Sequence, residues 1–577
     1  MSAFRLMFAL MSRRRRVQLA LTLLLMLLAA AAELLAIGAT MPFLALLTGQ
    51  EPARIGRLPG LLAFHGRPFL FAVLLLVGAA VSTAAIRLLL LWTGQRFVTG
   101  LGHDVATAIF ARTLRQPYAE FVRRNSSEVL AGMEKVRDMV GSVFQPAMQG
   151  VTGTVLALCI GALLFAIDPF AASIAAASVA AVYVAISLAT RARLQRNSRA
   201  IAETAVSRTK ILQEGMGGIR DIILEGSQPV FEAKFRRIDL RFRRAIAGNA
   251  LISQGPRFLI EAAGMVAIAL IAVGMSLQPG GLVKAIPVLG ALALGAQRLL
   301  PLLQQMYNGW SLVLGNLQSV RDVAALVRSP LVERRTGSAA PLPFERDIVF
   351  DRVGFRYAGG GFALGDVSLA VRRGEKIGIV GPTGGGKSSL LDLLMGLIDP
   401  DEGEIRIDGR RLDAATRGGW QAQLAHVPQS IYLADDSIAA NIAFGLPPER
   451  IDRDLIAWAG RAARLDGFVA SLERGYETLV GERGIRLSGG QRQRIGIARA
   501  LYRKARVLIL DEATSALDDE TEAQVIESIM GLEGGVTLIM IAHRRSTLAG
   551  CDRLFRVEKG RVVELSPPRP QAREAGA

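Results

Sequence analysis

The stretch GPTGGGKS, residues 381–388, decides the class of the C-terminal part of this chain. It matches the pattern G-x-x-x-x-G-K-[ST], follows the apolar pattern KIGIV and precedes the helical pattern SSLLDLLMGL. In that context the glycines let backbone N–H groups curl around phosphates, and the helix N-terminus adds a partial positive charge. We therefore expect a phosphate-binding loop made of Gly381, Pro382, Thr383, Gly384, Gly385, Gly386, Lys387, Ser388 and Ser389.

The chemistry expected of this loop needs a second motif, VLILDE at residues 507–512. In the loop, Lys387 reaches the β- and γ-phosphates and the Ser388 hydroxyl ligates Mg²⁺. The four apolar residues of VLILDE predict a buried parallel strand, and Asp511 at its end is placed to hold Mg²⁺ through water. Glu512 then follows as the general base for an attacking water molecule.

Three further motifs accompany these two: LSGGQ at 487–491, SALD at 515–518 and IAHR around His543. In this order and spacing the chain resembles the ATP-binding cassette (ABC) transporter family. The resemblance covers the whole soluble part and, with the apolar spans before it, the layout of an exporter half-transporter. It implies an all-α transmembrane domain of six helices followed by an α/β P-loop nucleotide-binding domain.

The resemblance also assigns roles to single residues. Tyr357, in VGFRY, matches the aromatic residue that stacks on adenine, although an ordinary strand aromatic is the alternative. Gln429, in HVPQS, matches the glutamine that touches Mg²⁺ and faces the membrane helices, and His543 matches the switch residue at the γ-phosphate. The implied cofactors are ATP and Mg²⁺. The implied catalytic set is Glu512, His543 and Gln429, and the implied Mg²⁺ set is Ser388, Gln429 and Asp511.

The LSGGQ motif implies a partner. In the ABC family this signature binds the ATP that the other cassette holds, so Ser488, Gly489, Gly490 and Gln491 would act in trans. One cassette per chain then implies a dimer, most simply a homodimer with twofold symmetry. A heterodimer stays open.

The composition places the remainder of the chain in a membrane. The chain has 577 residues, 51% of them hydrophobic, with a mean hydropathy of +0.35 and a formal net charge of +18. A basic balance in a membrane protein is typical of cytoplasmic loops that follow the positive-inside rule. No nucleic-acid-binding motif accompanies the charge, so we expect no nucleic-acid partner.

Six apolar stretches are long enough to cross a bilayer: near 17–47, 69–93, 140–166, 170–189, 258–277 and 284–316. The long segments 94–139 and 190–257 are rich in Arg and Lys, whereas the short loops carry fewer basic residues. The positive-inside rule therefore predicts that both long segments and both termini are cytoplasmic, and with the C-terminus the nucleotide-binding domain. The inner membrane of a bacterium is what the resemblance to bacterial flippases, described below, implies.

The predicted domains follow from these shifts. We expect a transmembrane domain over 1–327, a linker over 328–347, a nucleotide-binding domain over 348–566 and a disordered tail over 567–577. Each long cytoplasmic segment predicts helices that extend beyond the membrane. Short transverse coupling helices are expected near 114–125 and 216–226, with a plain amphipathic helix as the alternative.

Ionisable residues inside the spans are hypotheses about cargo. They are Glu33, Arg87, Arg257, Glu261 and Arg298. At ~1.5 Å per residue, Arg87 and Arg298 lie ~27 and ~21 Å from the outer ends of their helices, and Arg257 starts its span from the cytoplasmic side. The three arginines therefore converge on the inner half of the bilayer, where they suit an anionic lipid head group. Alternatively, Arg257 and Glu261 neutralise each other on one helix, and Arg87 pairs with Glu33 or snorkels.

A second resemblance favours a cargo. AELLAIGATMPFLALL, GPRFLIEAAG and QRLLPLLQQM are similar to segments of bacterial lipid-linked oligosaccharide flippases. In that family, arginines matching Arg87, Arg257 and Arg298 contact the lipid pyrophosphate. The resemblance implies a flippase for a polyprenyl-pyrophosphate oligosaccharide. The alternatives are an exporter of drugs or of another lipid such as lipid A, and an ATP-gated pore or regulator.

Overall fold

The computed structural model describes residues 8, 11–47, 68–123, 126–167, 169–276, 281–328, 342–357, 362–532, 535–542, 544 and 546–565. It divides into two compact units. The first holds residues 1–116 and 123–330, and the second holds residues 117–122 and 331–577. The predicted linker and tail fall largely outside the described residues.

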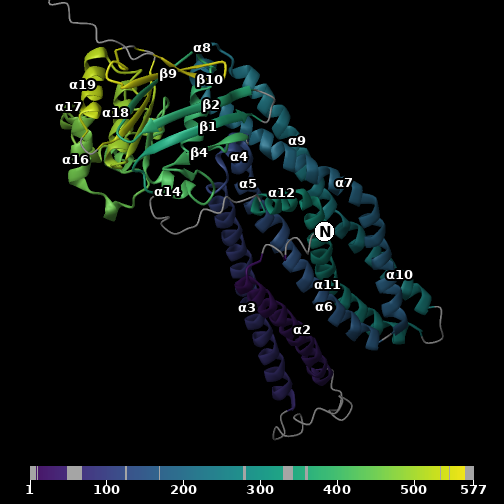
Figure 1. Cartoon of the computed structure of the whole chain (residues 1–577). Helices are drawn as coiled ribbons and strands as arrows, with labels where there is room; N and C mark the ends of the chain where they lie inside the picture. Colours follow the sequence, from purple (N-terminus) through teal and green to yellow (C-terminus); the bar gives the residue numbers. More distant parts are fainter. Residues whose placement is uncertain are drawn as a thin grey trace, which may run out of the picture. The chain divides into compact units, whose positions relative to one another are not determined.

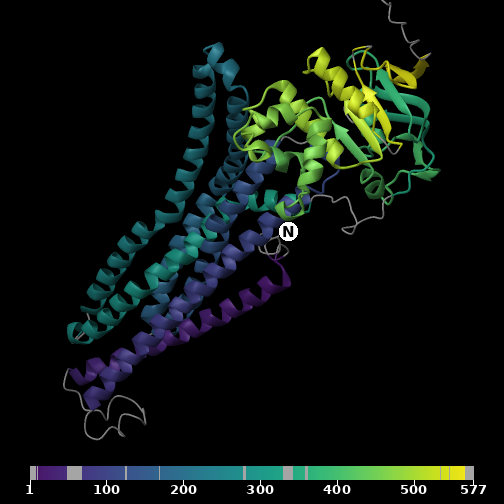
Figure 2. The ribbon, with the colours of Figure 1, turned by 90° about the vertical axis from the view of Figure 1, so that its left-hand side faces the viewer.

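The first unit is helical. Its long helices pack lengthwise, with α6 along α11 and α2 along α3, as Figures 1 and 2 show. Its elements are α2 Arg13–Leu47, α3 Pro68–Thr113, α5 Ser126–Met139, the π-helix η2 Val140–Phe144, α6 Gln145–Ile167, α7 Pro169–Gly217, α8 Ile219–Leu224, α9 Gln228–Gln254, α10 Pro256–Ser276, α11 Gly281–Gly315 and α12 Leu317–Val327.

Four helical segments of the described residues are long and apolar enough to cross a membrane: Arg13–Ala36, Phe69–Thr113, Ser127–Ala162 and Ala176–Gly217. They coincide with the first four predicted spans. The fifth and sixth fall on α10 and α11, where many side chains, including those of 281–296, lie outside the description. The helices bury few of the large apolar side chains of α2 and α3: Leu35 is 70% exposed and Leu88 67%. Such an exposed apolar surface suits lipid.

The predicted cytoplasmic extensions are helical. The helix α3 continues to Thr113 and α7 to Gly217, well beyond their apolar parts. Two short helices follow them, α4 Tyr118–Arg123 and α8, at the two places where the sequence predicts transverse helices. Residues 117–122 belong to the second unit, where Ala119 packs against the apolar core.

The crossing of α6 and α11 depends on glycine. A Cβ atom built on Gly309 would lie 2.6 Å from the carbonyl oxygen of Pro146, and one on Gly153 would lie 2.7 Å from the carbonyl oxygen of Leu302. The Cβ of Gly150 would also approach Gly309 to 3.3 Å. Only glycine lets the two backbones come this close, as at the small-residue crossings of membrane helices.

The second unit contains two sheets (Figure 1). The larger has the strand order β10-β9-β3-β8-β7-β6, and the smaller has the order β2-β1-β4-β5. Their bounds are β1 Asp347–Arg356, β2 Phe362–Arg372, β3 Lys376–Val380, β4 Glu402–Ile407, β5 Arg410–Arg411, β6 Leu424–Val427, β7 Val507–Asp511, β8 Thr537–Ile541, β9 Arg553–Glu558 and β10 Arg561–Leu565.

The helices and helical turns of this unit complete the α/β layers. They are α13 Lys387–Leu394, α14 Arg417–Gln421, α15 Ile438–Ile442, η3 Pro448–Arg450, α16 Arg453–Ala462, α17 Asp466–Ala470, η4 Gly475–Glu477, η5 Glu482–Gly484, α18 Gly489–Tyr502 and α19 Asp519–Met530. The strands β3, β6, β7 and β8 are mutually parallel, so their carboxyl ends meet at one edge of the sheet.

The sequence of β7 is continuously apolar because both faces of the strand are buried. Val507 and Ile509 belong to the apolar cluster that also contains residues of the smaller sheet, whereas Leu508 and Leu510 belong to the cluster formed with the helices α15–α19. Side chains alternate across a strand, and here both faces are covered. Asp511 therefore emerges where the buried strand ends, at the same sheet edge as the loop after β3.

Candidate functional site

The predicted phosphate-binding loop lies between β3 and α13. Lys387 begins the helix, is 8% exposed, and its Nζ donates hydrogen bonds to the carbonyl oxygens of Gly381, at 2.8 Å, and Pro382, at 3.1 Å. Gly384 and Gly386 take positive φ angles of 78° and 110°. The lysine thus closes the loop on itself, in a cradle whose backbone only glycine adopts readily.

Two of these glycines are also required by packing. A Cβ atom on Gly381 would lie 2.1 Å from the carbonyl oxygen of Val557, and one on Gly386 would lie 2.7 Å from that of Ala363. The loop is therefore pressed against β9 and β2. Because α13 begins immediately after it, the loop combines exposed backbone N–H groups with a helix N-terminus, which is an arrangement suited to phosphate.

The end of β7 brings three predicted residues to this edge. The Nε2 of Gln429, which follows β6, donates a hydrogen bond of 2.7 Å to Oε2 of Glu512. The backbone N–H of Glu512 donates to the carbonyl oxygen of Ile541 at 3.0 Å, and Glu512 itself has a φ of +49°. Asp511 and Ile541 are partners in the β7–β8 ladder. The general-base candidate is thus fixed to the neighbouring strand through its own backbone.

The electrostatics of this edge favour a cation. Burial, and then the neighbouring Glu512 carboxylate, raise the pKa of Asp511, while Lys387 opposes this rise. Burial, and then Asp511, raise the pKa of Asp392 on α13 to about 6. Crowded, half-buried carboxylates of this kind are relieved by positive charge.

The residues fit Mg²⁺ of the type that binds with a nucleotide. Among the described residues no group of three or more His, Cys, Asp or Glu side chains could hold a metal by itself. Mg²⁺ in phosphate sites usually takes one or two protein oxygens and fills its other positions with phosphate and water. Asp511 and Ser388, at this edge of the sheet, provide such a set.

Tyr357 lies against the phosphate-binding helix. Its hydroxyl is 3.0 Å from Oγ of Ser389, and its ring meets Phe355 edge-on with centroids 5.0 Å apart. The side chain is 46% exposed, so its ring is accessible. Burial, followed by Asp392 and Tyr357, raises the pKa of Tyr118 in the short helix α4. The predicted adenine-stacking residue therefore lies beside a residue that comes from the membrane segment.

The LSGGQ motif forms the N-terminus of α18. Oγ of Ser488 accepts the backbone N–H of Gln491 at 3.2 Å, and the side chain of Gln491 accepts the backbone N–H of Ser488 at 2.8 Å. This reciprocal pair is a capping box. Gly489 and Gly490 open the helix, where a Cβ on Gly490 would lie 3.1 Å from the carbonyl oxygen of Ala516. The motif therefore presents a second helix N-terminus suited to phosphate.

His543 lies outside the described residues, but Arg544 and Thr547 beyond it are described. Both contact Glu522, a residue that sequence reasoning missed. Glu522 is 6% exposed and belongs to the buried face that α19 shows at Val525 and Ile529. A carboxylate at this helical spacing among apolar residues was the signal available in the sequence.

The membrane helices bring two of the three predicted arginines together. Oε2 of Glu33, on α2, lies 2.6 Å from Arg87 on α3, and its Oε1 accepts a hydrogen bond of 3.1 Å from Arg298 on α11. The side chain of Glu33 is 5% exposed, while those of Arg87 and Arg298 are 47% and 61% exposed. The structure thus shows the pairing of Arg87 with Glu33 that the sequence offered as the alternative to snorkelling.

Arg257 is placed differently. Its Nε donates a hydrogen bond of 2.7 Å to Oε1 of Glu261, one turn along the same helix. This is the i, i+4 neutralisation that the sequence left open. The structure therefore joins Arg87 and Arg298 through Glu33, and gives Arg257 a partner on its own helix.

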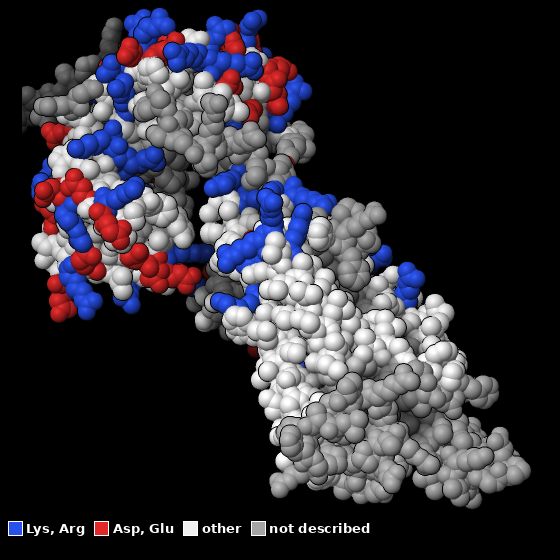
Figure 3. Space-filling model, turned by 90° about the horizontal axis from the view of Figure 1, so that it is seen from below, with Lys and Arg blue, Asp and Glu red and all other residues white. Residues whose placement is uncertain are grey.

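A basic groove lies on the extensions α7 and α9. Its lining contains four arginines and one carboxylate, and it encloses about 540 Å³. Arg241 pairs with that carboxylate, Glu203, at 3.2 Å. On the face shown in Figure 3, the Lys and Arg side chains of the helical unit gather toward one end and most of its other described surface is uncharged. The lining residues are Arg193, Arg196, Asn197, Arg199, Ala200, Glu203 and Arg241.

Comparison with known proteins decides the family. The model of ABC transporter transmembrane regions matches residues 19–284, and the ABC transporter model matches residues 364–515. An ATP-dependent lipid A-core flippase of Alkalilimnicola ehrlichii is 31% identical over 522 residues, which cover 89% of this chain and 84% of that protein. The chain belongs to the ABC transporter family.

Two further comparisons describe the transporter. An ATP-dependent lipid A-core flippase of Cupriavidus metallidurans is 37% identical over 386 residues, so the match spans 64% of the transporter but only 62% of that relative. A bacterial Atm1-family ABC exporter, solved with ATP bound, covers 95% of the transporter with a TM-score of 0.78 at 24% identity, and the transporter covers 94% of it. The transporter thus has the exporter fold, a helical transmembrane domain followed by an ATP-binding cassette.

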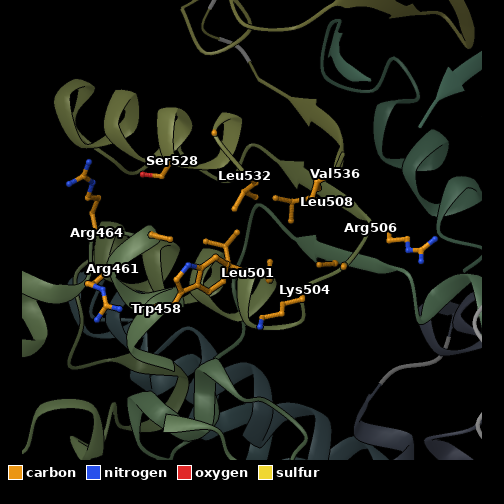
Figure 4. A pocket seen from close by; sticks show the side chains of 15 residues that line it. Trp458, Arg461, Arg464, Leu501, Lys504, Arg506, Leu508, Ser528, Leu532 and Val536 are labelled. Carbon is orange, nitrogen blue, oxygen red and sulfur yellow. The ribbon is translucent and has the colours of Figure 1, made fainter. Parts of the chain in front are cut away.

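A cavity of about 810 Å³ lies elsewhere in the second unit (Figure 4). Trp458, Leu501, Leu532 and Val536 line it, together with residues at the start of β7. It therefore lies toward the amino ends of the parallel strands, whereas the phosphate-binding loop follows the carboxyl end of β3.

Proposed function

We propose that the transporter is an ATP-driven flippase that moves an anionic glycolipid of the lipid A type from the cytoplasmic to the outer leaflet of a bacterial inner membrane. The observation that carries the proposal is the buried carboxylate of Glu33, which two arginines from different helices share. The names of the relatives favour the same class of cargo.

The charge of this cluster suits a phosphorylated head group. One carboxylate faces two guanidinium groups, so the cluster carries a net charge of +1 in each chain. Glu33 is buried and orients both arginines, which remain about half exposed. Each guanidinium has five N–H donors in a planar fork, so one bond to Glu33 leaves donors for phosphate oxygens. A hydrophobic drug would leave this charge unpaired.

The basic groove on α7 and α9 is a second place where positive charge would favour an anionic cargo. Arg193, Arg196 and Arg199 follow the apolar part of α7, beyond the fourth predicted span. With Arg241 they outnumber the single acid, Glu203. The positive-inside rule accounts for basic residues here, and a groove of this charge also attracts phosphorylated lipids of the inner leaflet.

The nucleotide side follows from the geometry at the sheet edge. Lys387 exchanges its two backbone carbonyl partners for phosphate oxygens, and the loop amides bind the rest of the phosphate chain. Mg²⁺, when bound, neutralises charge on the phosphates, and Asp511 and Ser388 would hold it together with Gln429. Glu512 accepts a proton from the attacking water, and His543 contacts the γ-phosphate. The exposed ring of Tyr357 would stack on the adenine base.

A homodimer would complete the site. The end of α7 and the helix α8 carry four exposed apolar residues: Met216, Ile219, Ile223 and Leu224. Met216 is 78% exposed and Leu224 is 74% exposed. The second unit exposes apolar residues of its own, Tyr432, Phe444 and Ile485. Exposed apolar patches on a soluble extension mark interaction sites. We propose that the first surface docks on the second of the partner copy, and that Ser488 and its two glycines cover the ATP of the partner.

A lipid-linked oligosaccharide is the second candidate cargo. Its pyrophosphate offers the same anionic oxygens to Arg87 and Arg298, and the sequence resemblance to flippases of that class supports it. The two cargoes differ in their tails and sugars, so a direct comparison of substrates separates them.

The test is lipid translocation by the purified transporter in proteoliposomes. We expect lipid A to stimulate ATP hydrolysis and to move between leaflets, and hydrophobic drugs to do neither. The triple variant Glu33→Gln/Arg87→Gln/Arg298→Gln leaves no buried charge unpaired, so it should lose translocation and keep basal ATP hydrolysis. Arg257→Gln is the matched control, because this arginine pairs within its own helix, and it should translocate normally.

Three outcomes would contradict parts of the proposal. Stimulation by a polyprenyl-pyrophosphate glycan alone would replace lipid A with the second candidate. Translocation that survives the triple variant would remove the two arginines from the cargo path. ATP binding that opens an ion conductance without directional lipid movement would indicate a gated pore.

A further inference from the structure

Glu522 joins two segments that the ATP site needs in register. It lies on α19, and its Oε1 accepts hydrogen bonds from Oγ1 of Thr514, at 2.8 Å, and Oγ1 of Thr547, at 2.6 Å. Its Oε2 is paired with the guanidinium of Arg544. Thr514 follows Glu512 by two positions, and Arg544 follows His543 directly. The buried carboxylate of Glu522 therefore contacts both the loop that follows Glu512 and the segment that follows His543.

Burial makes these contacts consequential. Glu522, Thr514 and Thr547 are each about 5 to 6% exposed. A buried carboxylate is stable only when its oxygens are satisfied, and losing one partner of a buried charged pair leaves the other unpaired. Arg544 is partly exposed and also reaches Asp519, whose side chain is 92% exposed. The carboxylate of Glu522, rather than that of Asp519, is thus the fixed point of the cluster.

The segment around residue 543 is held differently on its two sides. Before it, Ile541 is the ladder partner of Asp511 and accepts the backbone N–H of Glu512. These backbone contacts follow from the sheet and do not depend on any side chain. After it, Arg544 and Thr547 both contact Glu522, and Arg544 also reaches Asp519. Glu522 is the buried side chain that Arg544 and Thr547 share on this second side.

We propose that Glu522 is a positioning residue for ATP hydrolysis, which sets the segment carrying His543 in register with the loop that follows Glu512. The proposal rests on the roles proposed for Glu512 and His543, and it is independent of the cargo. Glu522 lies outside the phosphate-binding loop and outside LSGGQ, so it acts on turnover rather than on nucleotide affinity.

The loop it holds has a second set of contacts. Nε2 of Gln493, on α18, donates to Oγ of Ser515 at 3.1 Å, and its Oε1 accepts the backbone N–H of Ala516 at 2.8 Å. The loop 513–518 is therefore fixed to the LSGGQ helix on one side and, through Thr514 and Glu522, to the segment after residue 543 on the other.

The experiment measures kcat and KM for ATP in full-length transporter reconstituted in lipid. Glu522→Ala should lower kcat at least about tenfold, which is the scale of a misplaced acid–base or orienting group, and leave the KM for ATP within about threefold. Glu522→Gln should fall in between, because its amide oxygen still accepts from the threonines but carries no charge for Arg544. Glu527→Gln makes the same change at an exposed position of α19 and should behave as wild type.

Thr547→Val keeps the experiment decisive if Glu522→Ala fails to fold. It removes one hydroxyl donor with little change of shape, and it should lower kcat about threefold at unchanged nucleotide affinity. A thermal midpoint equal to that of wild type identifies a folded variant.

Two results would overturn the proposal. One is a kcat within twofold of wild type in folded Glu522 and Thr547 variants. The other is a parallel loss of kcat, nucleotide affinity and thermal midpoint, which would show that Glu522 only supports folding. Failure of lipid A to stimulate the wild-type protein would count against the proposed cargo and leave this comparison intact.

Discussion

Nε2 of Gln429 donates a hydrogen bond of 2.7 Å to Oε2 of Glu512. The two residues lie 83 positions apart in sequence, but they follow β6 and β7, which are adjacent parallel strands. The hydrogen bond fixes the orientation of the carboxylate that we propose accepts a proton from water. The residue expected to face the membrane helices therefore also touches the residue expected to start hydrolysis.

Replacing Glu512 should separate ATP binding from ATP hydrolysis. We expect Glu512→Gln to bind ATP as wild type does and to lower kcat by at least about 100-fold, because an amide cannot accept the proton of water. Binding is measured with a fluorescent ATP analogue, and turnover by phosphate release. Turnover near the wild-type rate would show that Glu512 is not the base. Gln429→Ala, which removes only the amide contact, should reduce kcat less.

Neutralising Glu33 should destabilise the membrane unit. Glu33→Gln leaves Arg87 and Arg298 without their shared carboxylate, at a cost below that of a fully buried pair because both guanidinium groups are about half exposed. We expect a lower thermal midpoint in detergent. The triple variant, in which all three residues become Gln, should recover most of it because no charge is left unpaired. An unchanged midpoint for Glu33→Gln alone would contradict this account.

Adding one methyl group at Gly309 should destabilise the crossing of α6 and α11. Gly309→Ala would place Cβ 2.6 Å from the carbonyl oxygen of Pro146, so the helices must separate, at a cost of about 1–3 kcal/mol. Gly94→Ala is the matched control, because a Cβ there meets no atom within 4 Å and alanine favours the helix. We expect the first variant to lower the thermal midpoint and the second to keep or raise it. Equal midpoints would show that the crossing tolerates a wider spacing.

Asp392 predicts a pH-dependent difference in stability. Burial and Asp511 raise its pKa from 3.8 to about 6, so the folded protein resists its ionisation. The stability that its protonated form contributes is complete below the unfolded-state pKa and is lost as pH rises through about 6. Asp392→Asn should therefore raise the thermal midpoint above pH 6, and the gain should shrink as pH falls toward 4. A gain that is constant with pH would contradict the assignment.

The sequence predicted the nucleotide-binding unit well because its signals are local. A glycine loop between a strand and a helix needs glycine for backbone geometry, and a buried strand that ends in Asp511 needs both faces covered. These requirements act within a few residues, so a pattern such as GPTGGGKS fixes chemistry and context together. The long helices were predicted for the same reason, since apolar length and charge are read along one segment, and the short helices α4 and α8 lie where the sequence predicted coupling helices.

Pairings between distant segments required the tertiary structure. Depth estimates placed Arg87, Arg257 and Arg298 in one layer, but depth says nothing about the side of a helix on which a residue lies. Only the packing of α2, α3 and α11 made Glu33 the shared partner of two arginines, while Arg257 found Glu261 on its own helix.

The same distinction applies inside the motor. The sequence alone determined the phosphate loop, the acidic strand end and the capped LSGGQ helix, because each is a short segment with its own geometric demand. Helical spacing alone could place Glu522 on the buried face of its helix, but its neighbours in DETEAQ are also charged. The sequence does not show which distant residues contact a carboxylate on a helix. The tertiary structure decided its role by burying it where Thr514, Arg544 and Thr547 meet, because a charge removed from water must take its stabilisation from whatever the fold places around it.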